Sequence, residues 1–193
     1  MLPNIHSTSD SNGLLEKFGC NQYHRYQLSD SQSNILKVIN QSPGIRYREL
    51  TRRTGFANGV LTYHLNILEQ IRCINKFKQS NVTRYYPIDI PIQDLKVISH
   101  LRVHSEKKII LFMLDHDFST FNEIVEHLRK APSTISWHLK RLCQDGVVAV
   151  HSGEYNLYRI IDRKLVNQMV HKYRECFTDK VVNNFIEIVD ELE

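Results

Sequence analysis

The sequence has few cysteines and no apolar run long enough to cross a membrane. Its longest uninterrupted apolar stretch, residues 109–114, has six residues, whereas a membrane-spanning helix needs about 20. The four cysteines lie far apart without a Cys-x-x-Cys pair, which excludes a disulfide scaffold and a cysteine-based zinc ribbon. Residues 1–6 carry neither the basic nor the apolar segment of a secretory signal. We therefore expect a cytoplasmic protein with no membrane association.

Motifs that would indicate catalysis are also missing. The sequence contains no glycine-rich phosphate loop, no supported Ser-His-Asp or Cys-His arrangement and no paired-carboxylate signature. His100 and His104 have the spacing of two zinc ligands on one helix, but no third ligand is clearly placed beside them. We expect a protein that is not an enzyme and that holds no metal or cofactor.

Positive charge is concentrated in one part of the chain. The whole sequence has 25 basic and 21 acidic residues, a net charge of +4. Residues 29–90 alone carry nine basic and four acidic residues, net +5, whereas residues 91–161 are nearly neutral with nine and eight. Such a segment is expected where a protein meets a polyanion. The alternative is a solvated surface that happens to be basic.

The sequence repeats itself at an offset of 74 residues for about forty positions without a gap. Residues 61–68 (LTYHLNIL) fall on residues 135–142 (ISWHLKRL), and residues 35–39 fall on residues 109–113. Solenoids repeat every 20–50 residues and need three or more units. A single repeat of this length therefore predicts two copies of one small domain.

Each copy predicts three helices followed by two short strands. Apolar residues at helical spacing, such as Leu61, Leu65 and Leu68, define the buried stripes. Thr120 and Glu123 form a capping-box pattern, and Pro132 suits the first turn of a helix. The predicted helices span about 31–41, 46–54 and 58–70, then 105–115, 121–130 and 132–144; the predicted strands span 73–77 and 83–86, then 147–150 and 155–158. This is the winged helix-turn-helix plan, a mainly α fold with small β-hairpin wings.

The remaining segments flank or connect the copies. Residues 1–27 are polar with little periodicity and predict a flexible arm. Residues 28–90 form the first winged-helix domain and residues 105–161 the second, with a connecting helix within 91–104. Residues 162–193 predict a long amphipathic helix, or two helices broken near Thr178. Its apolar positions are Val166, Val170, Tyr173, Phe177, Val181, Phe185, Ile188 and Leu192.

The repeat resembles winged-helix transcriptional regulators of the ArsR-like and MarR-like superfamily. The resemblance is carried by residues 42–50 (SPGIRYREL), 61–65 (LTYHL) and 82–87 (VTRYYP) in the first copy, and by 136–142 (SWHLKRL) and 145–148 (DGVV) in the second. It is most similar to the tandem winged-helix regulators common in archaea. The resemblance implies binding to double-stranded DNA and control of transcription. The metal-sensing cysteine box of many ArsR-like repressors is absent, and Ala57 and Ala131 stand where a polar N-cap is usual.

In this plan the third helix of each copy enters the major groove. In the first copy its exposed face would carry Asn58, Gly59, Thr62, Tyr63, His64 and Asn66, and in the second copy Ser133, Thr134, Ser136, Trp137 and Lys140. Basic residues beside it would neutralise phosphates: Arg46, Arg48, Arg52 and Arg53 around the second helix, and Lys76, Lys78 and Arg84 in the wing. Phosphate contacts position a protein on DNA, and base contacts give it specificity.

Several of these residues also allow a structural interpretation. Tyr85, Tyr86 and Tyr158 suit packing of the hairpins better than base contacts. His64 and His138, at equivalent positions, favour a polar or phosphate contact over a metal. Arg52 and Arg53 could belong to an ordinary solvated face.

The near-neutral second copy allows a second function. With Trp137 on its third helix, it could bind protein, as in chromosome-condensation accessory subunits or vesicle-sorting complexes. The C-terminal helix predicts a homodimer, because its apolar stripe needs a covering surface. The alternative is that this helix folds back on its own domain.

Overall fold

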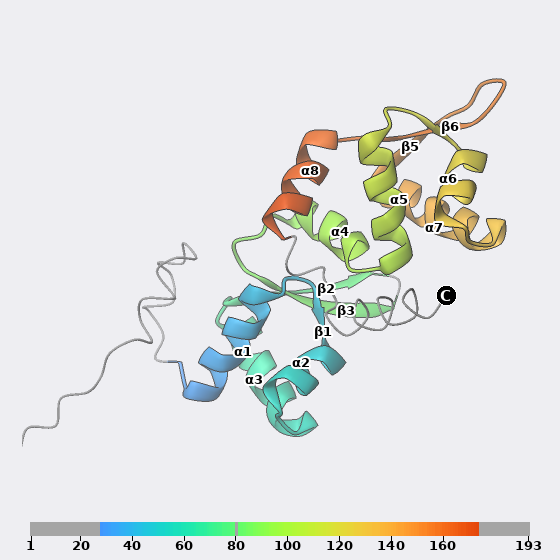
Figure 1. Ribbon diagram of the computed structural model, residues 1–193. Helices are drawn as coiled ribbons and strands as arrows, with labels where there is room; N and C mark the ends of the chain where they lie inside the picture. Colours follow the sequence, from blue (N-terminus) through green and yellow to red (C-terminus); the bar gives the residue numbers. More distant parts are fainter. Residues whose placement is uncertain (1–27, 80, 174–193) are drawn as a thin grey trace, which may run out of the picture.

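The computed structural model describes residues 28–79 and 81–173, which form two similar modules joined by a helix (Figure 1). The first module comprises α1 (Asp30–Gln41), β1 (Ile45–Arg46), α2 (Tyr47–Thr54), α3 (Asn58–Gln70), β2 (Ile74–Gln79) and β3 (Val82–Pro87). The second comprises α5 (His104–Asp115), β4 (Ser119–Thr120), α6 (Phe121–Leu128), α7 (Pro132–Gln144), β5 (Val148–His151) and β6 (Leu157–Ile160). Helix α4 (Ile92–Leu101) connects the modules, and α8 (Arg163–Lys172) follows the second. The predicted fold, two winged helix-turn-helix units with small hairpin wings, is confirmed.

Each wing is a three-stranded antiparallel sheet rather than a two-stranded hairpin. The strand orders are β1-β3-β2 and β4-β6-β5, so the last strand of each module lies in the centre. Ile45 pairs with Tyr85 in the first sheet, and Ser119 pairs with Tyr158 in the second. The sequence analysis missed β1 and β4, because two residues are too few to show a strand alternation.

The helix starts follow the local sequence. Thr120 and Glu123 form the predicted capping box, with backbone-to-side-chain hydrogen bonds of 2.7 and 3.3 Å. Helices α3 and α7 begin after Ala57 and Ala131, neither of which caps the helix with a side chain. Helix α5 starts at His104 after Val103, one residue before the predicted start.

The predicted apolar stripes form the cores. Ile35, Leu36, Val38 and Ile39 of α1 pack with the leucines of α3 in the first core. Tyr86 is fully buried and Tyr85 nearly so. The prediction that these two tyrosines pack in the core is therefore confirmed. Burial raises the pKa of both phenols.

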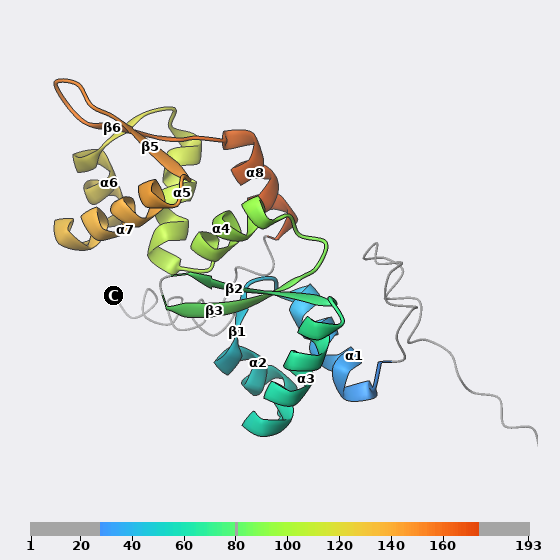
Figure 2. The same cartoon turned by 180° about the vertical axis from the view of Figure 1, so that it is seen from behind.

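Helix α4 packs into the core of the second module. Leu95, Ile98 and Leu101 lie in that core together with Tyr86, which comes from β3 of the first module. The Tyr86 hydroxyl donates to the carbonyl of Leu95 at 3.3 Å. The modules therefore share apolar packing, and α4 lies between them in both views (Figures 1 and 2).

A second tie between the modules surrounds the backbone of Gly44. Its carbonyl accepts hydrogen bonds from Arg84 at 2.8 Å and from Arg102 at 3.4 Å. Arg102, directly after α4, also donates to Glu49 of α2 at 3.2 Å. Gly44 has a φ of +77°, and a Cβ there would lie 3.2 Å from the Tyr86 ring, so the position requires glycine.

Helix α8 folds back onto its own chain. Val166, Met169 and Tyr173 are buried in the second core, and α8 packs against α4. The prediction that this stripe faces a partner is wrong for Val166 and Tyr173, because the chain's own second module covers them. The arm at 1–27 and the rest of the C-terminal stripe lie outside the described residues. Among the residues described, no helix has the length and apolarity needed to span a membrane.

Candidate nucleic-acid interface

A left-handed residue sets the angle between the second and third helices in each module. Gly55, with φ +72°, ends α2, and Arg129, at the equivalent position, ends α6 with φ +49°. The Tyr47 hydroxyl then links α2 to α3, because it donates to the Asn58 carbonyl at 2.7 Å and lies 3.0 Å from the Thr62 hydroxyl. These contacts fix the N-terminal half of α3 on its module.

Helix α3 presents the predicted polar face to solvent. Asn58, Gly59, Thr62, Tyr63 and Asn66 are exposed, and Tyr63 is the most prominent at 62%. His64 differs from the rest, since its ring is half-buried between Phe56 and Tyr63, with centroid distances of 6.3 and 5.2 Å. Its Nδ1 atom is buried without a hydrogen-bond partner among the described residues. The structure thus places His64 beneath the exposed face.

Exposed arginines surround the start and the outer face of α2. Arg46, Arg48 and Arg52 are exposed. Arg53 is also exposed, but its guanidinium donates to the Ser42 hydroxyl and lies 4.0 Å from Glu49. The structure therefore brings four predicted phosphate contacts beside α3, one of them already held by neighbours.

The first wing contributes two exposed lysines instead of three basic residues. Lys76 and Lys78 of β2 are exposed, and Lys76 lies 3.5 Å from Glu69. Arg84 is 3% exposed and donates to the Gly44 carbonyl, so its prediction as a phosphate contact is wrong. Burial, and after it the charge of Arg46, lowers the pKa of Arg84 to about 10. The cause is that β1 pairs with β3 at Arg84, which brings the Gly44 carbonyl next to its guanidinium.

Helix α7 presents a similar face with different chemistry. Ser133, Thr134, Ser136, Trp137 and Lys140 are all exposed. Trp137, at 55% exposure, occupies the position of Tyr63, and the guanidinium of Arg141 lies 4.8 Å from the centre of its ring. His138 next to it is buried.

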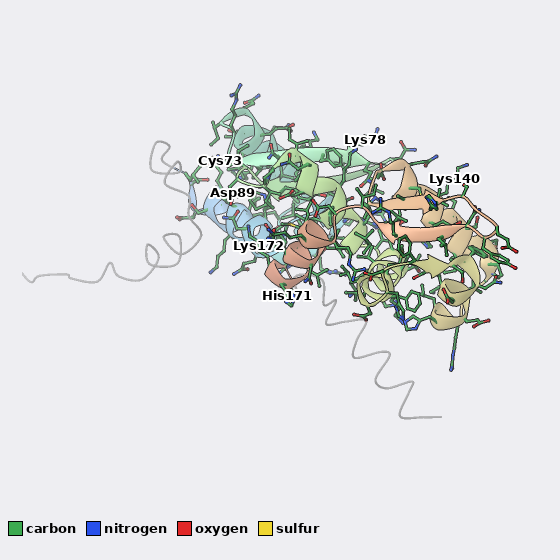
Figure 3. The ribbon with its side chains drawn as sticks, turned by 90° about the horizontal axis from the view of Figure 1, so that it is seen from above. Cys73, Lys78, Asp89, Lys140, His171 and Lys172 are labelled. Atoms are coloured by element: carbon green, nitrogen blue, oxygen red, sulfur yellow. The ribbon has the colours of Figure 1, made fainter. Side chains whose placement is uncertain are left out.

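The third helices of the two modules lie on the same side of the molecule. Helices α3 and α7 both lie toward the viewer when the chain is seen from behind (Figure 2). In the view from above, Lys78 of the first wing and Lys140 of α7 lie along one edge, whereas His171 and Lys172 lie toward the opposite side (Figure 3).

Beneath α7 lies a buried carboxylate that the sequence analysis did not single out. Glu106, in the first turn of α5, has no exposed surface. It accepts hydrogen bonds from His100 at 2.7 Å, His138 at 3.0 Å and Arg141 at 2.7 Å. His100 and His104, which have the sequence spacing of two zinc ligands on one helix, do not share a helix: His100 lies on α4 and bonds to Glu106, whereas His104 starts α5. No group of three metal-ligating side chains occurs within 28–79 and 81–173.

The partners of Glu106 determine its charge state. Burial alone raises the pKa of this carboxyl group, but hydrogen bonds from His100 and His138 and the charge of Arg141 outweigh burial. The net result is a pKa below the ordinary value of 4.5. Glu106 is therefore an anion at neutral pH.

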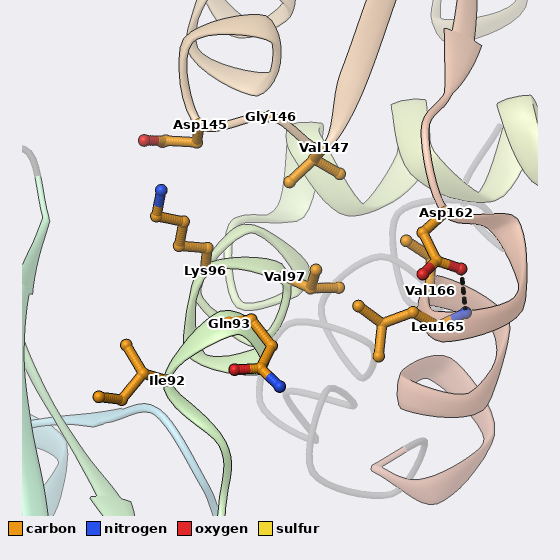
Figure 4. A pocket seen from close by; sticks show the side chains of 10 residues that line it. All are labelled: Ile92, Gln93, Lys96, Val97, Asp145, Gly146, Val147, Asp162, Leu165 and Val166. Atoms are coloured by element: carbon orange, nitrogen blue, oxygen red, sulfur yellow. Dashed lines mark hydrogen bonds between the residues drawn. The ribbon is translucent and has the colours of Figure 1, made fainter.

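A cavity of about 470 Å³ lies between α4, α8 and the turn after α7. Val97, Val147, Leu165 and Val166 give it an apolar lining (Figure 4). The ammonium group of Lys96 points toward the carboxylate of Asp145 across one side of it (Figure 4). Asp145 thus lies between the cavity and His100, whose Nε2 atom is 3.0 Å from the Asp145 carboxylate.

Comparison with known sequence families assigns a helix-turn-helix domain to each module. A family described as an N-terminal HTH domain matches residues 29–96, and the ArsR family of bacterial regulatory proteins matches residues 104–150. The chain is a tandem winged helix-turn-helix protein. Both matches include the third helix of their module.

Individual relatives of this tandem winged helix-turn-helix protein are distant. An uncharacterized HTH-type transcriptional regulator of Methanocaldococcus jannaschii is 28% identical over 135 residues, which is 70% of this chain and 34% of that protein. The chain thus spans about a third of the length of this relative. HlyU from Vibrio cholerae is 18% identical, with a TM-score of 0.38 over 42% of this chain and 91% of HlyU. Overoxidized AbfR bound to DNA is 17% identical, with a TM-score of 0.37 over 74% of this chain and 96% of AbfR.

The charge of Glu106 predicts a specific dependence of stability on pH. Because folding lowers its pKa, Glu106 stabilises the fold above its ordinary pKa, and this stabilisation is lost as the pH falls through the folded value. Glu106→Gln should lower the free energy of unfolding by about 3–5 kcal/mol at neutral pH, since it leaves buried positive partners unpaired. This deficit should shrink as the pH falls below 4.5 and through the folded value, as measured by chemical denaturation.

Glu126→Gln is the matched control, because it removes one carboxylate from the exposed face of α6. Its unfolding free energy should follow that of the parent chain at every pH. A deficit of Glu106→Gln that stayed constant down to the pH at which the parent chain unfolds in acid would contradict the assigned ionisation.

Proposed function

We propose that this tandem winged helix-turn-helix protein binds double-stranded DNA and regulates transcription. The observation that carries the proposal is the exposed polar and aromatic face of α3, flanked by exposed arginines of α2. The major groove of B-DNA admits one helix, and asparagine and threonine side chains can bond to base edges there. The names of the related families point to the same activity.

The first module supports this proposal most strongly. Arg46, Arg48 and Arg52 are positioned to neutralise phosphates beside a groove occupied by α3, and Lys76 and Lys78 extend the positive charge along the wing. Because Ala57 supplies no side-chain cap, the first N–H groups of α3 are also available to a phosphate. Asn58, Tyr63 and Asn66 would then contact bases or sugars.

The second module would contact the same duplex through α7. Its exposed face lies on the side occupied by α3, and Trp137 and Lys140 replace Tyr63 and Asn66 at the equivalent positions. The rival proposal is that α7 binds a protein, and the exposed Trp137 with its stacked Arg141 favours it.

The remaining proposals concern the state of the protein. We infer that it acts by binding rather than catalysis, without a cofactor, and that its cytoplasmic location follows from its DNA target. A homodimer stays a prediction from the sequence pattern of Phe177, Val181, Phe185, Ile188 and Leu192. If two chains bound successive turns of DNA, the target would be an inverted repeat.

Charge reversal on α2 tests DNA binding by the first module. The combined change Arg46→Glu, Arg48→Glu and Arg52→Glu should weaken binding to duplex DNA at least about 100-fold at low salt. Arg53 is left unchanged because it holds Ser42. For the parent chain the logarithm of affinity should fall with that of salt with a slope of about −5, from about six phosphate contacts. Fluorescence anisotropy of a labelled duplex measures both quantities.

Lys172→Glu is the control for this experiment, because Lys172 lies toward the side opposite Lys78 (Figure 3). It should bind DNA like the parent chain. Full binding by the triple variant, or an affinity that ignores salt, would refute the assigned surface.

Trp137 offers a direct test of the second module. It is the only tryptophan of the chain, so its fluorescence reports on α7 alone. If α7 enters the groove, saturating duplex should shift the emission maximum, and Trp137→Ala should weaken binding by about 1–3 kcal/mol. Unchanged emission together with full affinity of Trp137→Ala would favour the protein-binding alternative.

A further inference from the structure

The first wing and α7 meet in one group of polar side chains whose members are buried or partly buried. We call this group the ionic cluster. It consists of Gln79, His100, Glu106, His138, Arg141 and Asp145. Its members come from β2, α4, α5 and α7 and from the residue that ends α7. The cluster therefore connects the first wing to three helices of the rest of the chain.

One half of the cluster holds the wing. Gln79 is the last residue of β2 and is 9% exposed. Its amide nitrogen donates to the Asp145 carboxylate and lies 3.2 Å from Nε2 of His100. Lys78, the preceding residue, is the exposed lysine assigned to a phosphate. The end of the first wing is thus attached to the C-cap of α7.

The other half holds α7 from below. The Glu106 carboxylate accepts hydrogen bonds from His138 and Arg141, which are one and four residues beyond Trp137. Arg141 also stacks on the Trp137 ring. The bonds of His138 and Arg141 to Glu106 therefore help to position the exposed Trp137 on α7.

A contribution to the stability of the fold does not by itself explain why the chain has this ionic cluster. Buried ion pairs contribute little beyond what apolar residues of the same volume provide, because desolvating the charges is costly. Two cluster atoms, Oε1 of Gln79 and Nε of Arg141, are buried without a hydrogen-bond partner among the described residues. The best-attested role of buried polar groups is to specify one arrangement among several.

We propose that the ionic cluster fixes the spacing of α3 and α7, with His100 as the positioning residue at its centre. The inference rests on the proposed DNA binding by both modules. His100 acts through its neighbours, since it connects Asp145, which holds the wing, to Glu106, which holds α7. The spacing of the two subsites on a duplex is then a property of the folded chain.

His100 lies between two carboxylates, and contacts on both sides fix its ring. Nδ1 lies 2.7 Å from a Glu106 oxygen, and Nε2 lies 3.0 Å from an Asp145 oxygen. The Gln79 amide nitrogen lies 3.2 Å from the same Nε2 atom and donates to the Asp145 carboxylate. The ring, the amide and the carboxylate therefore hold one another in place.

The first experiment follows the wing without DNA. The side-chain amide protons of Gln79, seen by NMR in the full chain, should show a hydrogen-bonded shift in the parent chain. Asp145→Ala should lose this shift, because the acceptor is removed. Asp145→Asn should keep it, because the amide oxygen of asparagine can still accept from the Gln79 amide.

The second experiment measures spacing. The parent chain first selects a duplex from a random-sequence pool. A second duplex is then made by inserting about 4 base pairs between the two stretches that the modules protect. The parent chain should prefer the original duplex at least about tenfold, because the altered duplex does not allow simultaneous engagement of both modules. Asp145→Ala and Gln79→Ala, which break the cluster from opposite sides, should reduce this preference to within about twofold. Glu126→Gln is the control and should retain it.

Two results would overturn the proposal. One is an unchanged spacing preference in Asp145→Ala or Gln79→Ala although the Gln79 signal shows that the contact is lost. The other is a Gln79 amide signal that Asp145→Ala leaves unchanged. If the pool yields no bound duplex, the proposed function fails, whereas the NMR result still decides whether the cluster holds the wing.

Discussion

A carboxylate with no exposure to water must be surrounded by donors, and this constraint organises the centre of the molecule. Glu106 receives its donors from two other helices, α4 and α7, so three helices are held at one point. His100 also bonds to Asp145, and Asp145 accepts a hydrogen bond from Gln79 of the first wing. Apolar packing of Tyr86 against α4 brings the modules together, and the buried polar contacts restrict how they can be arranged.

The two modules keep one backbone plan while their exposed chemistry has diverged. Gly55 and Arg129 both end the second helix in the left-handed region, although only glycine adopts it without strain. Tyr63 and Asn66 of α3 correspond to Trp137 and Lys140 of α7, and arginines are abundant around α2 only. The first module therefore supplies most of the positive charge, and the second supplies the large aromatic surface.

Much of this could be predicted from the sequence because it depends on local pattern. The bounds of α3 and α7 follow from their leucine and isoleucine stripes, and the capping box at Thr120 marks the start of α6. Arg84 was misassigned because its burial depends on β1, a two-residue strand without a sequence signal, which makes β3 central. Glu106 was missed because an acidic residue in a first helical turn is usually exposed. Its α7 partners lie 32 and 35 residues away in sequence.

The central proposal is that one chain binds a single DNA duplex with α3 and α7 together, both from the same side. Hydroxyl-radical footprinting of a selected duplex by the full chain tests this claim most directly. The account predicts two protected stretches on one face of the duplex, with the stretch assigned to α7 lost in a chain that carries Trp137→Ala and Lys140→Ala. A single protected stretch that this double change leaves intact would contradict it.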